Sequence, residues 1–324
     1  MVLNYNRLES ECFFEWKLRL CKAKLNKELD LDWQEISDIL GLNVSADHLR
    51  KTAYGMLEYD EYIHGFNGVG TTILSISDLH YPFAKPLETF SDYVGKTDIL
   101  QLNGDILDCM QLSRFNKIYR TSPIEEIIEG RQYIIDLIEM IKPKKVLVNH
   151  GNHELRMGQF LSKHLDNELQ ELLPETAFDY IFLDGFTHYD RKTKSKIKYA
   201  PLCDVFDDIE ITYTRTWYSQ YNDILFCHPK AYSSSPLKTA EKAVYWFRNE
   251  GFNFNNLIMS HTHRIGSYKI GNTMIYEQGC CCETKDMRYN DGQLINSQKE
   301  GFMFVCLDQN GNLINEKTKI ITLN

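Results

Sequence analysis

The sequence predicts an α/β protein with an all-helical extension at its N-terminus. From residue 71 onward, short apolar, β-branched segments alternate with amphipathic stretches, which is typical of a mainly parallel sheet with helices outside it. Residues 1–64 instead show helical periodicity. The ends of several predicted strands carry aspartate, asparagine or histidine, and ligands of parallel sheets bind at those ends.

The N-terminal extension is predicted to contain three helices. The first covers residues 8–27, the second begins after an N-cap at Asp30 or Asp32, and the third begins after Ser45. A Gly-containing turn at residues 41–43 gives the last two a helix-turn-helix outline.

This outline leaves two interpretations open. In one, the third helix binds DNA through side chains such as Arg50 and Lys51; in the other, the helices form a small bundle that packs on the second domain or on a partner. Residues 1–70 contain 8 Lys and Arg against 12 Asp and Glu, which favours the bundle because DNA-recognition modules are usually basic. We place this domain at 1–64 and the second at 65–324, with a Gly-rich linker over 63–70.

The second domain is predicted to hold two packed sheets. We expect its strands at 71–77, 98–102, 146–148, 224–227, 257–260, 267–271, 273–277, 301–307 and 314–322, with a turn at Asn310-Gly311. Helices are expected at 87–94 and over 123–141, where proline takes the first helical position. Residues 184–200 and 284–299 are interpreted as long polar loops.

Composition excludes several classes of protein. The apolar fraction of 43% is ordinary for a globular protein, and no apolar run approaches the roughly 18–20 residues of a membrane helix. The N-terminus lacks signal-peptide features. The nine cysteines show no Cys-x-x-Cys spacing, and we expect the protein to be located in a reducing cytoplasm. A net charge of −9 argues against tight binding of long DNA but not against a phosphate-bearing substrate.

Five short segments at strand ends carry metal-ligand side chains. In chain order they are Asp78-Leu79-His80, Gly104-Asp105 with Asp108, Gly151-Asn152-His153-Glu154, His228, and His261-Thr262-His263. One such segment alone is usually structural, but five in this order, each after an apolar run, point to one site. Their carboxylate, amide and imidazole groups are enough to hold two divalent cations and to hydrolyse a phosphate ester between them.

Spacing suggests how the side chains converge. Alternate residues of an extended segment point the same way, so Asp78 and His80 are expected to face the site together, as are His261 and His263.

The remaining segments suggest individual roles. Gly104 permits the tight turn that a bridging carboxylate at Asp105 needs, and Asn152 offers a neutral oxygen. His153 sits where a general acid could protonate the leaving oxygen, and Glu154 is placed to orient that imidazole. Structural interpretations are kept for three others: His150 as a strand-end histidine behind the ligands, Asp108 as a helix cap, and His164 as a solvated side chain.

The order of these motifs resembles the calcineurin-like metallophosphoesterase superfamily over about residues 72–308. The resemblance implies a four-layer αββα sandwich with a dinuclear metal site. One metal would be held by Asp78, His80, Asp105 and His263, and the other by Asp105, Asn152, His228 and His261. His153 would donate the proton, and a hydroxide bridging the metals would be the nucleophile. We expect manganese ions, although iron, zinc, nickel, cobalt and magnesium accept such donors.

The substrate class depends on two missing arginines. The motifs look like those of serine/threonine protein phosphatases, which carry arginine after the second aspartate and before Gly-Asn-His; here these positions are Cys109 and His150. Neither can clamp a terminal phosphate bidentately, which favours a diester. Arg114 and Arg156, together with His150, are the candidate substrate-binding residues, and a clamp made by the two arginines would instead suit a monoester.

We therefore expect a metal-dependent phosphodiesterase that acts on nucleotides or on nucleic acid, preferably short or single-stranded. The alternatives are a phosphomonoesterase or protein phosphatase, and a non-catalytic binding module that retains the fold; the intact ligand set disfavours the last. No membrane partner is expected. The helical extension and residues 279–282 resemble phosphoesterases of bacteriophages and their Gram-positive hosts.

Overall fold

The structure, a computed structural model, describes residues 5–8, 11–64, 68–114, 121–287 and 298–323. The chain divides into two compact units, Met1–Gly68 and Val69–Asn324. The division falls within the Gly-rich linker that the sequence predicts, part of which lies outside the described residues.

The first unit contains three helices, α1 (Phe13–Leu25), α2 (Trp33–Ile39) and α3 (Ala46–His64). Helix α1 begins later than predicted because Cys12 is its N-cap and closes a capping box with Glu15. Asp32, not Asp30, caps α2. The apolar faces of the helices share one core, which includes Leu20, Leu29, Ile36, Leu40, Leu49 and Ala53.

The cations that DNA binding would require are engaged within α3. Arg50 and Lys51 both pair with Asp47, at 2.9 and 2.7 Å. Exposed ion pairs of this kind are weak, so the acidic balance of residues 1–70 remains the observation that favours a bundle over DNA binding.

Two sheets form the centre of the second unit. The larger has the order β13 (Lys319–Thr322), β12 (Gly301–Leu307), β1 (Thr71–Ile76), β2 (Ile99–Asn103), β3 (Lys145–Asn149) and β6 (Glu210–Tyr213). Its last four strands are parallel. The smaller has the order β10 (Ile265–Ile270), β11 (Thr273–Gln278), β9 (Asn256–Met259), β8 (Ile224–Cys227) and β7 (Tyr218–Tyr221), with the middle three parallel.

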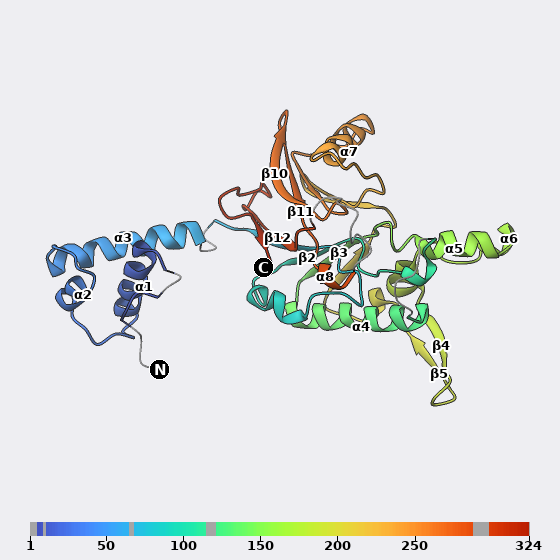
Figure 1. Ribbon diagram of the computed structural model, residues 1–324, viewed down its shortest axis with the longest axis horizontal. Helices are drawn as coiled ribbons and strands as arrows, with labels where there is room; N and C mark the ends of the chain where they lie inside the picture. Colours follow the sequence, from blue (N-terminus) through green and yellow to red (C-terminus); the bar gives the residue numbers. More distant parts are fainter. Residues whose placement is uncertain (1–4, 9–10, 65–67, 115–120, 288–297, 324) are drawn as a thin grey trace. The chain divides into compact units, whose positions relative to one another are not determined.

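Three apolar layers hold this unit together as a four-layer αββα sandwich (Figure 1). Helix α4 (Pro123–Ile141) packs Ile127, Ile134 and Ile138 onto the outer face of the six-stranded sheet. Between the sheets, residues such as Ile73 face residues such as Phe226. Helix α7 (Lys238–Asn249) covers the outer face of the five-stranded sheet. The four layers that the family resemblance implies are therefore present.

Shorter elements connect these layers. They are the 3-10 helices η1 (Leu87–Tyr93), η2 (Met110–Leu112) and η4 (Leu202–Asp204), the π-helix η3 (Asp179–Asp184), and the helices α5 (Arg156–His164), α6 (Asn167–Gln170) and α8 (Thr284–Met287). The segment predicted as a helix at 87–94 is thus a 3-10 helix. The predicted polar loop at 284–299 begins with α8 and then lies mostly outside the described residues.

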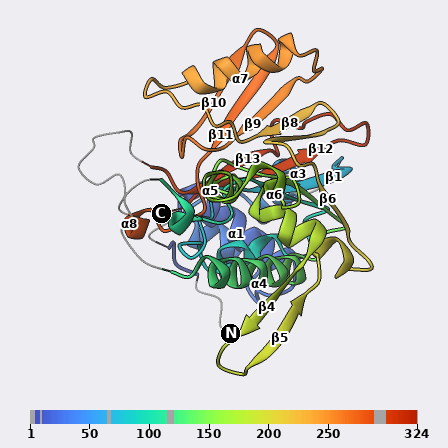
Figure 2. The same cartoon turned by 90° about the vertical axis from the view of Figure 1, so that its right-hand side faces the viewer.

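The prediction of a polar loop at 184–200 is wrong. This segment forms a hairpin of β4 (Phe186–Asp190) and β5 (Ser195–Tyr199), which extends away from the rest of the unit (Figure 2). The rings of Phe186 and Tyr199 stack 4.8 Å apart at its base, and the Asp190 side chain accepts the N–H of Lys192 at its tip. The many lysines of this segment make it polar overall. Because the hairpin has no buried face, apolar and polar residues do not alternate clearly, and the sequence signal for strands is weak. No described helix is long and apolar enough to cross a membrane.

Candidate metal centre

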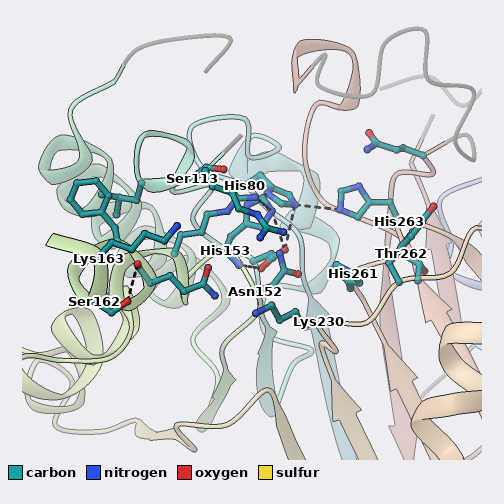
Figure 3. Close-up of a pocket in the computed structure, with 18 of the residues that line it drawn as sticks. His80, Ser113, Asn152, His153, Ser162, Lys163, Lys230, His261, Thr262 and His263 are labelled. Atoms are coloured by element: carbon teal, nitrogen blue, oxygen red, sulfur yellow. Dashed lines mark hydrogen bonds and ion pairs between the residues drawn. The ribbon is translucent and has the colours of Figure 1, made fainter. Parts of the chain in front are cut away.

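Both sheets deliver side chains to one place. Strands β1, β2 and β3 of the larger sheet lead into Asp78 and His80, Asp105, and Asn152 and His153 respectively. Strands β8 and β9 of the smaller sheet lead into His228, and into His261 and His263. Figure 3 shows His80, Asn152 and His153 on one side of a pocket and His261 and His263 on the other. The structure therefore brings together all five predicted segments.

The backbone reaches this arrangement by an unexpected route. Asp78, His80, Asp105, His261 and His263 all have positive φ, between 47° and 81°. The expectation that extended backbone aligns the alternate residues is therefore wrong, because tight turns aim these side chains instead. Left-handed backbone costs a non-glycine residue on the order of 1 kcal/mol, and it persists where surrounding contacts impose it.

Two glycines allow the Asp105 turn to approach its neighbours. Gly104 has φ +78°, and a Cβ there would lie 2.7 Å from the backbone nitrogen of Gly151. A Cβ on Gly151 would in turn collide with the Asp105 carboxylate. The prediction that Gly104 permits a tight turn before Asp105 is confirmed.

Glu154 holds the Asp105 turn in place and does not orient His153. Its carboxylate, which is fully buried, accepts the backbone N–H groups of Asp105, Ile106, Leu107 and Gly151 at 2.8–3.0 Å. These four bonds occupy both oxygens, so the interpretation of Glu154 as the group that orients His153 is corrected. The sequence could not show this, because the donors lie 47–49 residues away or on the same turn.

One cluster of ligand atoms consists of Asp78, His80 and His263. His263 Nε2 lies 3.0 Å from Asp78 Oδ1 and 3.3 Å from His80 Nε2. All three residues are buried. Donor atoms that share an octahedral ion with bonds of about 2.1 Å lie roughly 3 Å apart, so this spacing suits a common cation.

A second cluster consists of Asp105, His228 and His261. His228 Nδ1 donates to Asn103 O at 2.8 Å, which turns Nε2 toward Asp105 Oδ2 at 3.1 Å. His228 Nε2 and Asn152 Oδ1 are both buried, and neither makes a hydrogen bond within the described residues. Buried polar atoms rarely lack partners, so the donor set fits a second cation that would satisfy both.

Asp108 and Arg156 hold His153 between them. Asp108 Oδ1 lies 3.1 Å from His153 Nδ1 and 3.2 Å from His80 Nδ1. Arg156 donates to His153 Nε2 at 2.7 Å and to the Asp108 carbonyl at 2.6 Å. Because guanidinium only donates, His153 Nε2 is the acceptor and its proton lies on Nδ1. Asp108 is therefore a partner of two site histidines and not a helix cap.

Electrostatics prepares the two clusters for cations. Burial would lower the pKa of His228, but Asp105 and Asp78 outweigh it and raise this pKa to about 9. This excess of negative charge attracts a metal as well as a proton. Burial and then His228 lower the pKa of His261 to about 3, which leaves a neutral imidazole able to bind metal. Burial also lowers the pKa of His153.

The centre opens into a pocket of about 750 Å³. Four of the described lining residues are cationic, namely Arg114, Arg156, Lys163 and Lys230, whereas Asp105 is the single carboxylate among them. Phe160 and Tyr232 also line the walls, and His164 stacks on Phe160 with ring centroids 4.2 Å apart.

Several of these wall residues escaped the sequence interpretation. Lys230 follows His228 by two residues, so the loop after a ligand-bearing strand was the available signal. Lys163 and His164 reach the pocket because α5 begins just after Glu154. His150, by contrast, is buried and is not among the described residues that line this pocket, so its role in substrate binding stays a prediction.

Comparison with known proteins supplies one strong match. The family model for calcineurin-like phosphoesterases matches residues 71–265, which is more than half of the chain. No curated protein sequence matches.

Solved structures give weaker likenesses. Vacuolar protein sorting 29 from Cryptosporidium parvum is 14% identical with a TM-score of 0.39, and the match covers 79% of this chain and 97% of that one. An archaeal phosphodiesterase is 14% identical with a TM-score of 0.36, covering 78% and 100%. A zinc complex of Vps29 from Entamoeba histolytica is 13% identical with a TM-score of 0.37, covering 78% and 98%. Values this low say nothing about the activity of this chain.

Proposed function

The chain belongs to the calcineurin-like phosphoesterase family, and from that premise we propose that it is a dinuclear metal-dependent phosphodiesterase acting on nucleotides or single-stranded nucleic acid. The observation that carries the substrate class is the charge of the pocket. Four cationic side chains surround one carboxylate, although the whole chain has a net charge of −9. A wall of this kind suits a substrate that bears phosphates beyond the one being cleaved.

Two divalent ions would be held by the two clusters. Asp78, His80, Asp105 and His263 would bind one ion, and Asp105, Asn152, His228 and His261 the other. When bound, such ions supply Lewis acidity and neutralise charge on the phosphate.

His153 is the proposed proton donor to the leaving oxygen. Its Nδ1 lies at Asp108, and its Nε2 accepts from Arg156. A proton on Nε2 therefore requires that the guanidinium move away, and a substrate phosphate would draw it away. Arg156 would in this way couple substrate binding to the protonation of His153.

The residues Cys109 and His150 also support a diester. They stand at the two positions where a terminal phosphate would need bidentate guanidinium groups, and neither side chain can supply one. Arg114 and Arg156 nevertheless both line the pocket, which keeps a monoesterase as the second candidate.

An activity panel with added Mn²⁺ tests the proposal. It compares bis-p-nitrophenyl phosphate, p-nitrophenyl phosphate, cyclic nucleotides, and single- and double-stranded DNA, with Asp105→Asn as the inactive control. We expect the larger kcat/KM for the bis ester, and cleavage of single strands over duplexes. A preference for p-nitrophenyl phosphate, or efficient dephosphorylation of a phosphoserine peptide, would reverse the assignment.

The contribution of the pocket wall can be measured separately. Lys163→Ala should leave kcat/KM for the small bis ester within about twofold, because that substrate has no second phosphate. It should raise KM for an oligonucleotide several-fold and reduce the dependence of KM on salt. Equal effects on both substrates would contradict a role in binding flanking phosphates.

A further inference from the structure

The three consecutive cysteines lie directly behind the metal centre. They follow β11, and Gly279 before them has φ +84°. Backbone bridges from Cys280 to Glu300 and from Cys282 to Ala84 keep the segment extended. Successive side chains of an extended segment point to opposite sides. Cys281 accordingly packs in the main core, whereas Cys280 and Cys282 share a separate small cluster with Met287.

His263 faces this cysteine pair with its second nitrogen. Its Nε2 points to Asp78 at 3.0 Å, so Nδ1 points the other way. Ligand atoms of His263, Cys280 and Cys282 all lie within 4.8 Å of one another. The three residues are 5%, 0% and 0% exposed. His263 Nδ1 is buried, and the Cys280 side chain is its polar neighbour.

We propose that Cys280, Cys282 and His263 Nδ1 form a third cation site, selective for a thiophilic divalent ion of the zinc class. Two sulfurs and one imidazole are donors that zinc accepts, whereas manganese and magnesium prefer oxygen. The three ligands leave a fourth tetrahedral position, and the Lys299 carbonyl, 3.3 Å from Cys280 Sγ, is a candidate for it. The donor set thus differs from the two clusters in front of it, which combine oxygen and imidazole donors without sulfur.

His263 would join this ion to the hydrolytic centre. Binding at Nδ1 with both thiols releases the two thiol protons to solvent. With a cation also on the Nε2 side, the remaining ring proton would pass to solvent, and His263 would hold both ions as an imidazolate. The inference does not depend on the proposed hydrolytic function, because the three ligands alone define the site.

Cobalt titration of the full chain tests this site. Chelator-treated, reduced protein is titrated with Co²⁺, and the thiolate-to-cobalt charge-transfer absorption in the near ultraviolet is followed. Carboxylate and imidazole ligands do not produce this absorption. We expect the band to grow to about one equivalent of thiolate-bound cobalt and to disappear when Zn²⁺ is added.

Matched variants locate the ligands. Cys280→Ser and Cys282→Ser should each lose the band, and Cys281→Ser, an equally buried neighbour on the opposite side, should keep it. A wild-type protein that binds Co²⁺ without the band would overturn the proposal whether or not the variants fold. So would a band that survives in folded Cys280→Ser and Cys282→Ser. A protein that shows the band but hydrolyses nothing loses only the proposed function, and an active protein without the band loses only this inference.

Discussion

The six-stranded sheet supplies every oxygen donor of the metal centre, Asp78, Asp105 and Asn152, whereas the five-stranded sheet supplies imidazoles only. The two contributions are also held differently. Three backbone N–H groups of the Asp105 turn and that of Gly151 donate to the Glu154 carboxylate, which also follows a strand of the larger sheet. His228, which follows a strand of the five-stranded sheet, is instead held by the six-stranded sheet, because its Nδ1 donates to Asn103 O at 2.8 Å. We call the residues from the six-stranded sheet the oxygen half of the centre and those from the five-stranded sheet the imidazole half. The oxygen half is held in place without metal, whereas the position of the imidazole half depends on how the two sheets pack.

The largest effect is expected where the halves meet. Asp105→Asn should reduce hydrolysis of the bis ester below detection, because this carboxylate lies beside ligands from both sheets. Metal analysis should show a loss of bound ion in parallel, with the fold retained by circular dichroism. Wild-type metal content and activity in this variant would remove Asp105 from its bridging role.

Proton donation should separate from metal binding within the oxygen half. His153→Ala should lose about 10²–10⁴-fold in kcat while its metal content stays unchanged. The loss should shrink for an ester with a very good leaving group, which needs little protonation. His261→Ala is the matched comparison from the other sheet and should lose metal as well as activity. If metal content collapses in His153→Ala, that histidine is a ligand.

The backbone support of the oxygen half can be broken without touching a ligand. In Glu154→Gln one oxygen becomes an NH₂ group, which leaves two buried N–H groups without an acceptor. Each unmet donor costs about 1–3 kcal/mol, so urea unfolding should show a loss of a few kcal/mol. Glu139→Gln, at an exposed position on α4, should change stability little. Equal stabilities would mean that Glu154 does not hold the turn.

The smallest effect is expected in the imidazole half. Ser260, directly before His261, donates to Asn103 O at 2.8 Å. Ser260→Ala should lower the free energy of unfolding by about 1 kcal/mol and change kcat/KM less than tenfold, because His228 keeps its own contact with that carbonyl. A large loss of activity with normal stability would show that Ser260 sets the imidazole geometry.

The same division explains what the sequence could reveal. Ligand types at strand ends are local, so Asp78, Asn152 and His261 could be found from their segments and from the order of those segments. Helix α4 was predictable to its ends because proline opens it and its apolar period is regular. Glu154 was misassigned because its partners are backbone groups of a turn distant in sequence, and a motif shows only side chains.

Other features had a weak local signal or none. Asp and His adopt left-handed backbone more often than most residues, but this preference is too weak to locate it at Asp78 and His261, where the neighbouring turns impose it. Lys163 reaches the pocket only because α5 lies beside it, so it looked like an ordinary polar residue, and the role of Asp108 depends on His80 and His153, which lie far from it in sequence.

At the five ligand positions with left-handed backbone, activity and stability favour different residues. Glycine adopts positive φ freely, so a glycine at His261 or His263 would relax the chain while removing a ligand. A selection for thermal stability alone would therefore enrich glycine at these positions and return folded, inactive proteins. Stabilising this chain for practical use should start elsewhere, on the helices and the hairpin, and leave the strained turns as they are.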